Sequence, residues 1–142
     1  MSKYRYLTIK DIGEEFYIKR LNSSLTELIL GRARPIYIKF PLKLDENLAK
    51  ICAMLLDGSL DKNFMKVMFC QKKDKNKLIE ANKIIKIYFG ISSKSYIYRP
   101  DIINFNNKTL SYFFHKYLEM HKCDYEANIP NWIKKSPQSI IR

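Results

Sequence analysis

The segment that most restricts how this chain can fold is residues 48–60, which read LAKICAMLLDGSL. As a helix it carries two apolar stripes, one made of Leu48, Ile51, Cys52 and Leu55 and the other of Ala49, Ala53 and Leu56. Lys50 is its only clearly polar residue before Asp57, so we expect the helix to be covered on two sides. A sheet of the same chain can cover one side. A second copy of the helix, packed closely through small residues, can cover the other.

Asp57 and Gly58 end this apolar segment. The C-terminus of a helix carries the negative end of the helix dipole, so a carboxylate at that place favours a bound cation. Two copies of the helix packed together would bring two such carboxylates near each other. Paired carboxylates are suitable ligands for a divalent metal ion.

The charge of the chain favours a polyanionic partner, with nucleic acid as the first choice. The formal net charge is +12, from 26 lysine and arginine residues against 14 aspartate and glutamate residues. Residues 41–61 are the one net acidic stretch, and residues 62–86 directly after them carry eight bases and two acids. An anionic site beside a cationic surface suits a metal-dependent enzyme that acts on nucleic acid.

Length and composition indicate one domain, or one domain with a short extension, because the chain has 142 residues of which 46% are apolar. No apolar run approaches the roughly 18 residues of a membrane-spanning helix, and no signal-peptide pattern opens the chain, so we expect a cytoplasmic protein. Three separated cysteines and two histidines argue against a disulfide framework and against a structural zinc site.

Periodicity and capping residues predict an α+β fold. At the N-terminus we expect two short helices, at 8–19 and 23–31, the second stopped by Gly31. The YIKF segment that follows looks extended. The elements predicted after it are helix 46–56 with Asp45 as N-cap, strands 59–61 and 64–71, helix 74–89 ended by Gly90, strands 94–99 and 101–106, and helix 109–121. From residue 46 onward the order is therefore αββαββα.

This order and two motifs resemble the LAGLIDADG homing endonucleases. The signature helix of that family ends in Asp-Gly and is followed by a strand, as CAMLLDGSL does here. The preceding FPLKLDENLA is similar to the lead-in of archaeal and intein-borne members, and IPNWI at 129–133 is similar to the segment before the second signature helix of two-motif members. The resemblance covers residues 41–142 and implies an αββαββα half-domain with a saddle-like antiparallel sheet. Residues 1–40 would form a short helical and basic extension.

The resemblance implies a Mg²⁺-dependent endonuclease that hydrolyses phosphodiester bonds in a long double-stranded DNA site as a homodimer. Asp57 matches the metal-binding acid of the family, and Gly58 matches the glycine that turns into the first strand. Gln71 and Lys122 resemble in position residues that orient water and neutralise the scissile phosphate, so the implied catalytic residues are Asp57, Gln71 and Lys122. The implied dimer interface consists of Ala49, Cys52, Ala53 and Leu56. Leu56 departs from the family pattern, which prefers glycine or alanine there.

We expect the sheet to contact DNA. Val67 and Phe69 share one face of their strand and should lie in the core, so Lys66, Met68 and Cys70 on the other face should meet the groove. Lys, Arg, Asn and Gln side chains on a ribbon can read base edges in the major groove, whereas the lysines that follow residue 71 are expected to touch phosphate. The predicted DNA contacts are Lys62, Lys66, Lys72, Lys73, Lys75, Lys94, Tyr96, Arg99 and Asn104.

Three classes of function stay open. The chain is a nuclease, a protein of the same fold that has lost cleavage and serves as an RNA-splicing maturase or DNA-binding regulator, or a basic α+β domain that uses its helix for self-association alone. Leu56 favours the second class. Residues 1–40 are either an arm that contacts phosphate through Arg32 and Arg34 or a helical cap on the sheet. One signature helix implies a homodimer or one half of a longer protein.

Overall fold

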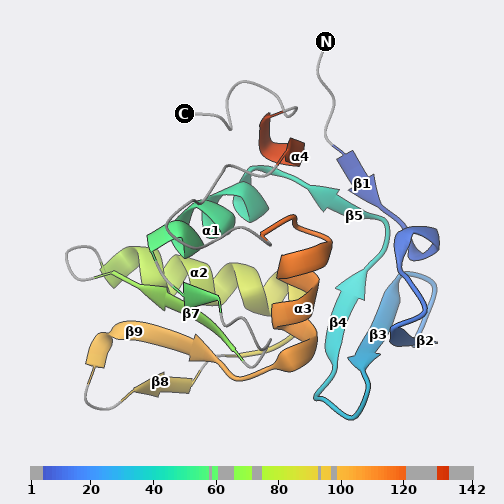
Figure 1. Ribbon diagram of the computed structural model, residues 1–142, viewed down its shortest axis with the longest axis horizontal. Coiled ribbons are helices and arrows are strands. Elements are labelled where there is room, and N and C mark those ends of the chain that lie inside the picture. The colour runs from blue at the N-terminus through green and yellow to red at the C-terminus, as the bar shows by residue number, and fades with distance from the viewer. Residues whose placement is uncertain are drawn as a thin grey trace.

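The computed structural model describes residues 5–57, 59–60, 66–71, 75–92, 94–96, 99–120 and 131–134. Within them the protein is a mixed α+β structure in which all strand pairs are antiparallel (Figure 1). The strands are β1 (Arg5–Leu7), β2 (Phe16–Arg20), β3 (Leu25–Leu30), β4 (Ile36–Lys39), β5 (Leu42–Leu44), β6 (Ser59–Leu60), β7 (Val67–Cys70), β8 (Lys94–Tyr96) and β9 (Arg99–Phe105). The helices are a 3-10 turn (Ile9–Asp11), α1 (Glu46–Asp57), α2 (Lys75–Phe89), α3 (Lys108–Lys116) and α4 (Asn131–Lys134). None of the described helices is both long and apolar enough to cross a membrane.

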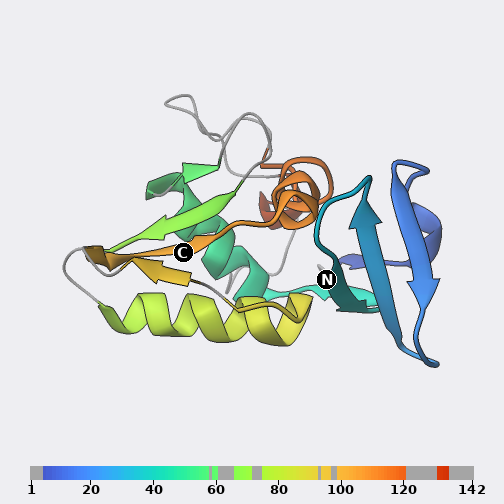
Figure 2. The same ribbon diagram turned by 90° about the horizontal axis from the view of Figure 1, so that it is seen from below.

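From α1 to α3 the elements follow the αββαββα order that the sequence predicts. Their four-stranded sheet has the strand order β6-β7-β9-β8, and α2 runs along one side of it (Figure 2). Val67 pairs with Phe105 and Phe69 pairs with Ile103, and all four side chains are buried. Met68 and Cys70, which alternate with Val67 and Phe69 along β7, are only half-buried. This confirms the predicted alternation of the strand.

The start of α1 is fixed by Asp45, as predicted. The Oδ1 atom of Asp45 accepts hydrogen bonds from the backbone amides of Asn47 and Leu48, both at 3.1 Å, so it satisfies two amides that the first helical turn leaves free. The Tyr88 hydroxyl donates to the other carboxylate oxygen, Oδ2, at 2.5 Å. This contact ties the beginning of α1 to the last turn of α2.

Gly90 ends α2, also as predicted, and the structure gives two reasons for a glycine there. Its φ of +70° lies in the left-handed region, and its amide donates to the Lys86 carbonyl at 2.9 Å. A Cβ at this position would come within 2.9 Å of the Tyr37 Cβ. The close approach packs the end of α2 against β4.

The helices predicted at 8–19 and 23–31 are wrong, and with them the helical character of the N-terminal extension. Apart from the 3-10 turn, the described regular elements before α1 are strands, and β2, β3 and β4 form a three-stranded sheet in that order. Between β2 and β3, the Asn22 side chain accepts hydrogen bonds from the amides of Ser24 and Leu25 at 3.0 and 2.8 Å, which builds a hairpin turn. Gly31, with φ +59°, lies in the next turn instead of at a helix end.

The alternation of side chains in β3 explains this correction. Thr26 and Leu28 are buried, whereas Leu25, Glu27 and Ile29 are half-buried, so LTELIL has the period of a strand with one covered face. The YIKF segment is extended as predicted, because β4 spans Ile36–Lys39. Two other boundaries also shift: β9 already begins at Arg99, and α3 ends at Lys116 instead of 121.

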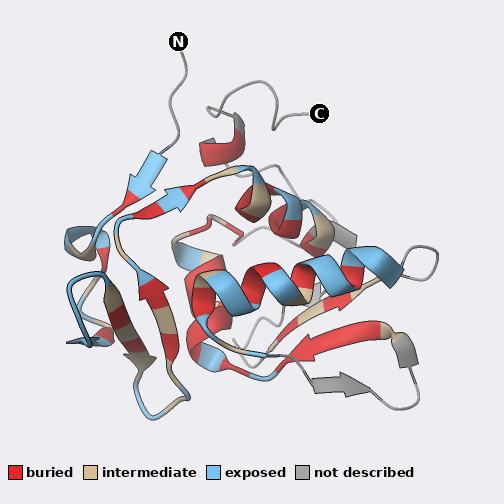
Figure 3. Cartoon of the chain, turned by 180° about the vertical axis from the view of Figure 1, so that it is seen from behind, coloured by how far each residue is buried: buried red, intermediate tan, exposed pale blue. Residues whose placement is uncertain are grey.

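A single buried cluster joins the N-terminal strands to the rest of the chain. It contains Leu28, Ile36 and Ile38 from the three-stranded sheet and Leu110 and Phe113 from α3. Figure 1 places α3 between the three-stranded and the four-stranded sheet, and Figure 3 shows buried residues along β3, β4 and α3. β1 also pairs with β5, which crosses the boundary expected at residue 40. The described residues before 41 therefore share one core with the described residues that follow.

Candidate nucleic-acid interface

The predicted metal-binding acid, Asp57, is the last residue of α1. β6 begins two positions later, and Ser59 of β6 pairs with Met68 of β7, so the end of α1 lies beside an edge strand of the four-stranded sheet. The side chain of Asp57 lies outside the described part of the chain, as do Gly58 and Lys122. Among the described residues, no group of three or more His, Cys, Asp or Glu side chains could hold a metal ion.

Gln71, the third predicted catalytic residue, directly follows β7 and is half-buried. Its backbone amide donates to the carbonyl of Asp101 at 2.9 Å, which continues the pairing of β7 with β9 by one more bond. The pairing of β7 with β9 thus fixes the backbone of Gln71 at the end of β7.

The predicted dimer interface on α1 is divided by the structure. Ala49 and Cys52 are 5% and 1% exposed and belong to the core of this chain, and burial raises the pKa of the Cys52 thiol. Ala53 is exposed, and the side chain of Leu56 lies outside the described residues. Of the described members of the set, only Ala53 is therefore on the open surface of α1.

Three of the predicted DNA contacts have described side chains. Lys75 is exposed and Lys66 is half-buried, so both can reach solvent. Asn104 is discussed below. Lys62, Lys72 and Lys73 lie outside the described residues, and for Lys94, Tyr96 and Arg99 the backbone alone is described, in β8 and β9.

Asn104 requires a correction. The sequence predicts that it faces DNA, whereas its side chain is 2% exposed, and its Nδ2 donates to Asn106 Oδ1 at 2.6 Å. A base edge cannot reach it in this arrangement. Its neighbour Asn106, which lies two residues further along the chain, is exposed. Asn104 pairs with Met68 on one neighbouring strand and with Lys94 on the other, so the three residues form a row across the sheet. The hydrogen bond links this row to the accessible side-chain amide of Asn106 at the end of β9.

Two adjoining pockets open beside Asn106. They lie where the turn between β3 and β4 meets the end of β9 and the start of α3, and both are lined by Arg34, Asn106 and Asn107. One has a volume of about 320 Å³ and adds Tyr37 and Phe105 to its lining. The other has a volume of about 460 Å³ and adds Arg32 and Lys108.

Buried polar side chains at the start of α3 hold the turn that carries the two arginines. Thr109, which is fully buried, donates its hydroxyl to the Arg34 carbonyl at 2.7 Å and accepts from the Leu30 amide at 3.1 Å. Asn107 caps α3 by accepting from the Leu110 amide at 2.9 Å, and its Nδ2 donates to the Pro35 carbonyl at 3.1 Å. Both ends of the turn are therefore fixed against the helix.

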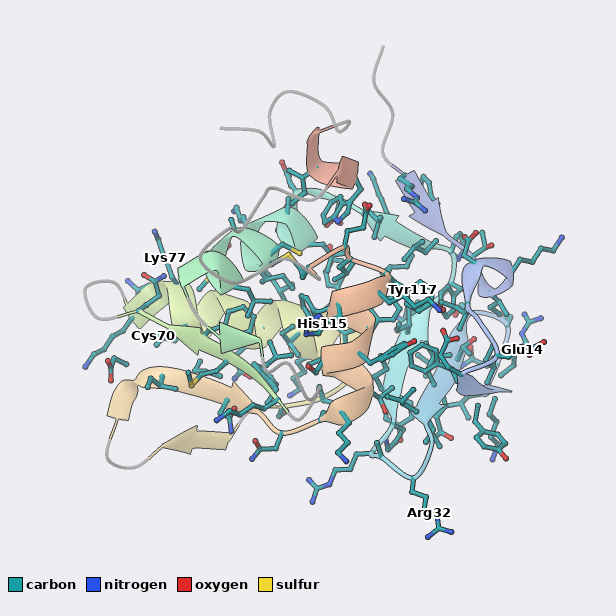
Figure 4. The ribbon with its side chains drawn as sticks, in the orientation of Figure 1. Glu14, Arg32, Cys70, Lys77, His115 and Tyr117 are labelled. Atoms are coloured by element: carbon teal, nitrogen blue, oxygen red, sulfur yellow. The ribbon has the colours of Figure 1, made fainter. Side chains whose placement is uncertain are left out.

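The basic side chains at the pockets are open to solvent. Arg32, Arg34 and Lys108 are exposed, and the described lining residues of the two pockets include no acid. In Figure 4 the Arg32 guanidinium extends from the tip of the turn away from the body of the protein. The sequence suggests Arg32 and Arg34 as one option for phosphate contacts, but it gives no signal that Lys108 or Asn106 lies beside them. These residues meet the arginines only because β3, β4 and α3 pack together.

A different arrangement surrounds Lys116 at the other end of α3. Its Nζ lies 3.1 Å from Glu15 Oε1, the Tyr117 hydroxyl donates to the same oxygen at 2.5 Å, and Tyr117 accepts from the Gly13 amide at 2.7 Å. Burial alone would raise the pKa of Glu15, but the hydrogen bonds from Tyr117 and Lys116 lower this pKa below its ordinary value. This cluster, near the Tyr117 label in Figure 4, fastens the N-terminal segment to α3 and uses its lysine internally.

Comparisons with known protein families and with curated proteins found no match for this chain. The arrangement of its own residues is the basis for a functional assignment. That arrangement combines a four-stranded sheet with a helix ending in aspartate at one edge and a basic pair of pockets at the end of β9. Such a surface can bind an extended polyanion.

Proposed function

We propose that this protein binds double-stranded DNA and cleaves it as a Mg²⁺-dependent, LAGLIDADG-type homing endonuclease, acting as a homodimer. The observation that carries the proposal is the junction of α1 and β6: an apolar helix ends at Asp57, and the next residues enter the edge strand of a β6-β7-β9-β8 sheet within an αββαββα unit. The net charge of +12 supports a nucleic-acid partner.

The donor chemistry fits a metal ion shared between two copies of the chain. Each chain offers one aspartate at the end of α1, and no described cluster of acids completes a site within a single chain. Mg²⁺ keeps several of its waters and accepts one or two carboxylate ligands, so one Asp57 from each copy suffices. When bound, the ion would supply an activated water and stabilise charge on the leaving oxygen.

The protein groups would act around that reaction. Asp57 of each copy would hold the ion, and Gln71 would orient a water through its side-chain amide. Lys122 would neutralise charge on the scissile phosphate. Lys66 meets the groove, and Lys75, with Lys72 and Lys73, binds the DNA backbone.

A second function is a DNA- or RNA-binding protein of the same fold without cleavage, such as a maturase or regulator. Leu56 favours this alternative, because a bulky residue next to Asp57 would hold two packed helices farther apart than a small one. A larger separation of the two Asp57 carboxylates would weaken a shared metal site.

The first experiment compares the wild-type protein with Asp57→Asn on a library of duplex DNA, once with Mg²⁺ and once with Ca²⁺, and sequences any cut ends. Cleavage by the wild type in Mg²⁺ alone, lost in the variant, supports the nuclease. Salt-sensitive binding by both proteins without cleavage supports the alternative. Absence of binding to duplex DNA by both proteins would contradict the nuclease and the DNA-binding form of the alternative.

A further inference from the structure

We propose that the two pockets between the β3–β4 turn and the start of α3 hold the phosphate backbone of a nucleic acid that lies beyond the four-stranded sheet. This inference rests on the proposed function and names a contact that extends it to the N-terminal strands. The site consists of Arg32, Arg34, Asn106 and Lys108, with Asn107 and Thr109 as the residues that position them.

The site is built before any ligand arrives. Thr109 and Asn107 are 0% and 6% exposed. Their side chains hold the backbone of Leu30, Arg34 and Pro35 at the ends of the β3–β4 turn that carries the two arginines. Buried polar groups are costly unless they are hydrogen-bonded, so this network fixes one position of the turn against α3. The carbonyl of Arg34 is one of the fixed groups. A preorganised site loses little entropy when an anion binds.

Within the described part of the chain, no acid lines the site to neutralise its positive charge. Two exposed lysines elsewhere pair with acids, with Lys50 at 3.3 Å from Glu80 and Lys116 at 3.1 Å from Glu15. The lining residues that the structure describes, in contrast, include two arginines and one lysine and no acid. Lys108 is also the first residue of α3, where the positive end of the helix dipole adds to the attraction for an anion.

The shape of the site favours a nucleic-acid backbone over a small free anion. Two pockets share a wall made of Arg34 and two asparagines, so the basic groups line an extended surface instead of one enclosed hole. The pocket of about 320 Å³ also has an apolar lining from Tyr37, Ile91 and Phe105, which suits contact with a sugar or with the face of a base. Asn106 connects this surface to the sheet through its bond with Asn104.

These contacts would add affinity without adding sequence information. Arginine and lysine contacts to phosphate are independent of the base sequence, and each one makes binding more sensitive to salt. We therefore expect that, through this site, each protomer contacts a longer stretch of DNA on one flank.

The test measures the affinity for a duplex of random sequence as a function of salt, in Ca²⁺ and in the Asp57→Asn background, so that cleavage plays no part. The variant carries Arg32→Ala, Arg34→Ala and Lys108→Ala. The matched control carries Arg5→Ala, Lys19→Ala and Arg20→Ala, which remove the same charges from exposed positions away from the pockets. We expect the pocket variant to bind roughly tenfold to hundredfold more weakly and to lose about 2–3 from the slope of log affinity against log salt. The control should lose less than about 1.

Other outcomes separate the two hypotheses. If the parent protein does not bind any duplex, the proposed function fails. If it binds and the pocket variant keeps the slope of the control, the pockets are not a DNA contact, although the proposed function stands. If inorganic phosphate shifts the amide resonances of Arg34, Asn106 and Lys108 while the DNA slope is unchanged, the site binds a small anion and the inference is overturned. Lys108→Ala alone, which should lose about 1 from the slope, gives the same decision should the triple variant not fold.

Discussion

Tyr88 shows how one side chain can link two helices and also report on that link. Its hydroxyl donates to Asp45 Oδ2 at 2.5 Å and accepts from Asn47 Nδ2 at 3.2 Å. Asp45 in turn caps α1 through its other oxygen. The helix that carries Asp57 is thus anchored through its N-cap, Asp45, to the end of α2.

This link predicts an unusual titration. Burial, followed by the hydrogen bond to Asp45, raises the pKa of Tyr88 from its ordinary value of 10.0 to about 12. Because the protonated phenol is favoured in the folded state, its contribution to stability is complete below pH 10 and is lost as the pH rises through about 12. The phenolate absorbance of wild type minus that of Tyr88→Phe should show a midpoint near 12. A midpoint at the ordinary value would mean that Tyr88 is neither buried nor bonded to Asp45 in solution.

At the scale of elements, the turns decide how the N-terminal strands meet the helices. The β3–β4 turn needs Gly31 at φ +59°, and the end of α2 needs Gly90 at φ +70°. A Cβ on Gly31 would meet no atom within 4 Å, whereas a Cβ on Gly90 would lie 2.9 Å from the Tyr37 Cβ. The two glycines therefore share one backbone conformation but differ in their surroundings.

This difference predicts unequal effects of alanine. Gly31→Ala should lower the free energy of unfolding by about 1–2 kcal/mol, the usual cost of a left-handed alanine. Gly90→Ala should lower it by about 2–4 kcal/mol, because overpacking against Tyr37 is added. Urea denaturation of both variants measures the two values. Equal losses would show that β4 moves away from α2 without a penalty.

The elements also show what the sequence can and cannot predict. Helix 46–56 and helix 74–89 are confirmed, because long apolar periodicity, a cap at Asp45 and a stop at Gly90 all agree. The segments 8–19 and 23–31 are short, and their apolar residues fit a helical period almost as well as a strand period. Hydrogen bonds made by Asn22 and packing against α3 select the strand. Such long-range packing is not readable from a local pattern.

The whole molecule explains why only part of the candidate site follows from the sequence. Asp57 and its place at the end of α1 follow from one continuous segment. The pockets instead combine a turn near residue 32, the end of β9 and the first residue of α3, which meet only in the folded core. Asn104 failed as a predicted contact for the same reason, because the alternation of a strand does not tell which further segments cover its outer face.

The core also limits how two copies of the chain can assemble through α1. Ala49 and Cys52 are already buried, so a dimer along this helix must use its remaining surface, where Ala53 is exposed. We expect the wild type to be a dimer and Ala53→Glu to be a monomer, because two unpaired carboxylates would be buried at the contact. A cost of about 3 kcal/mol would weaken the dimer roughly a hundredfold. Sedimentation equilibrium over a range of concentrations measures this, with Ala53→Ser as the control that keeps a small side chain and should stay dimeric. A wild type that stays monomeric at all concentrations would rule out a shared Asp57 site between two free chains.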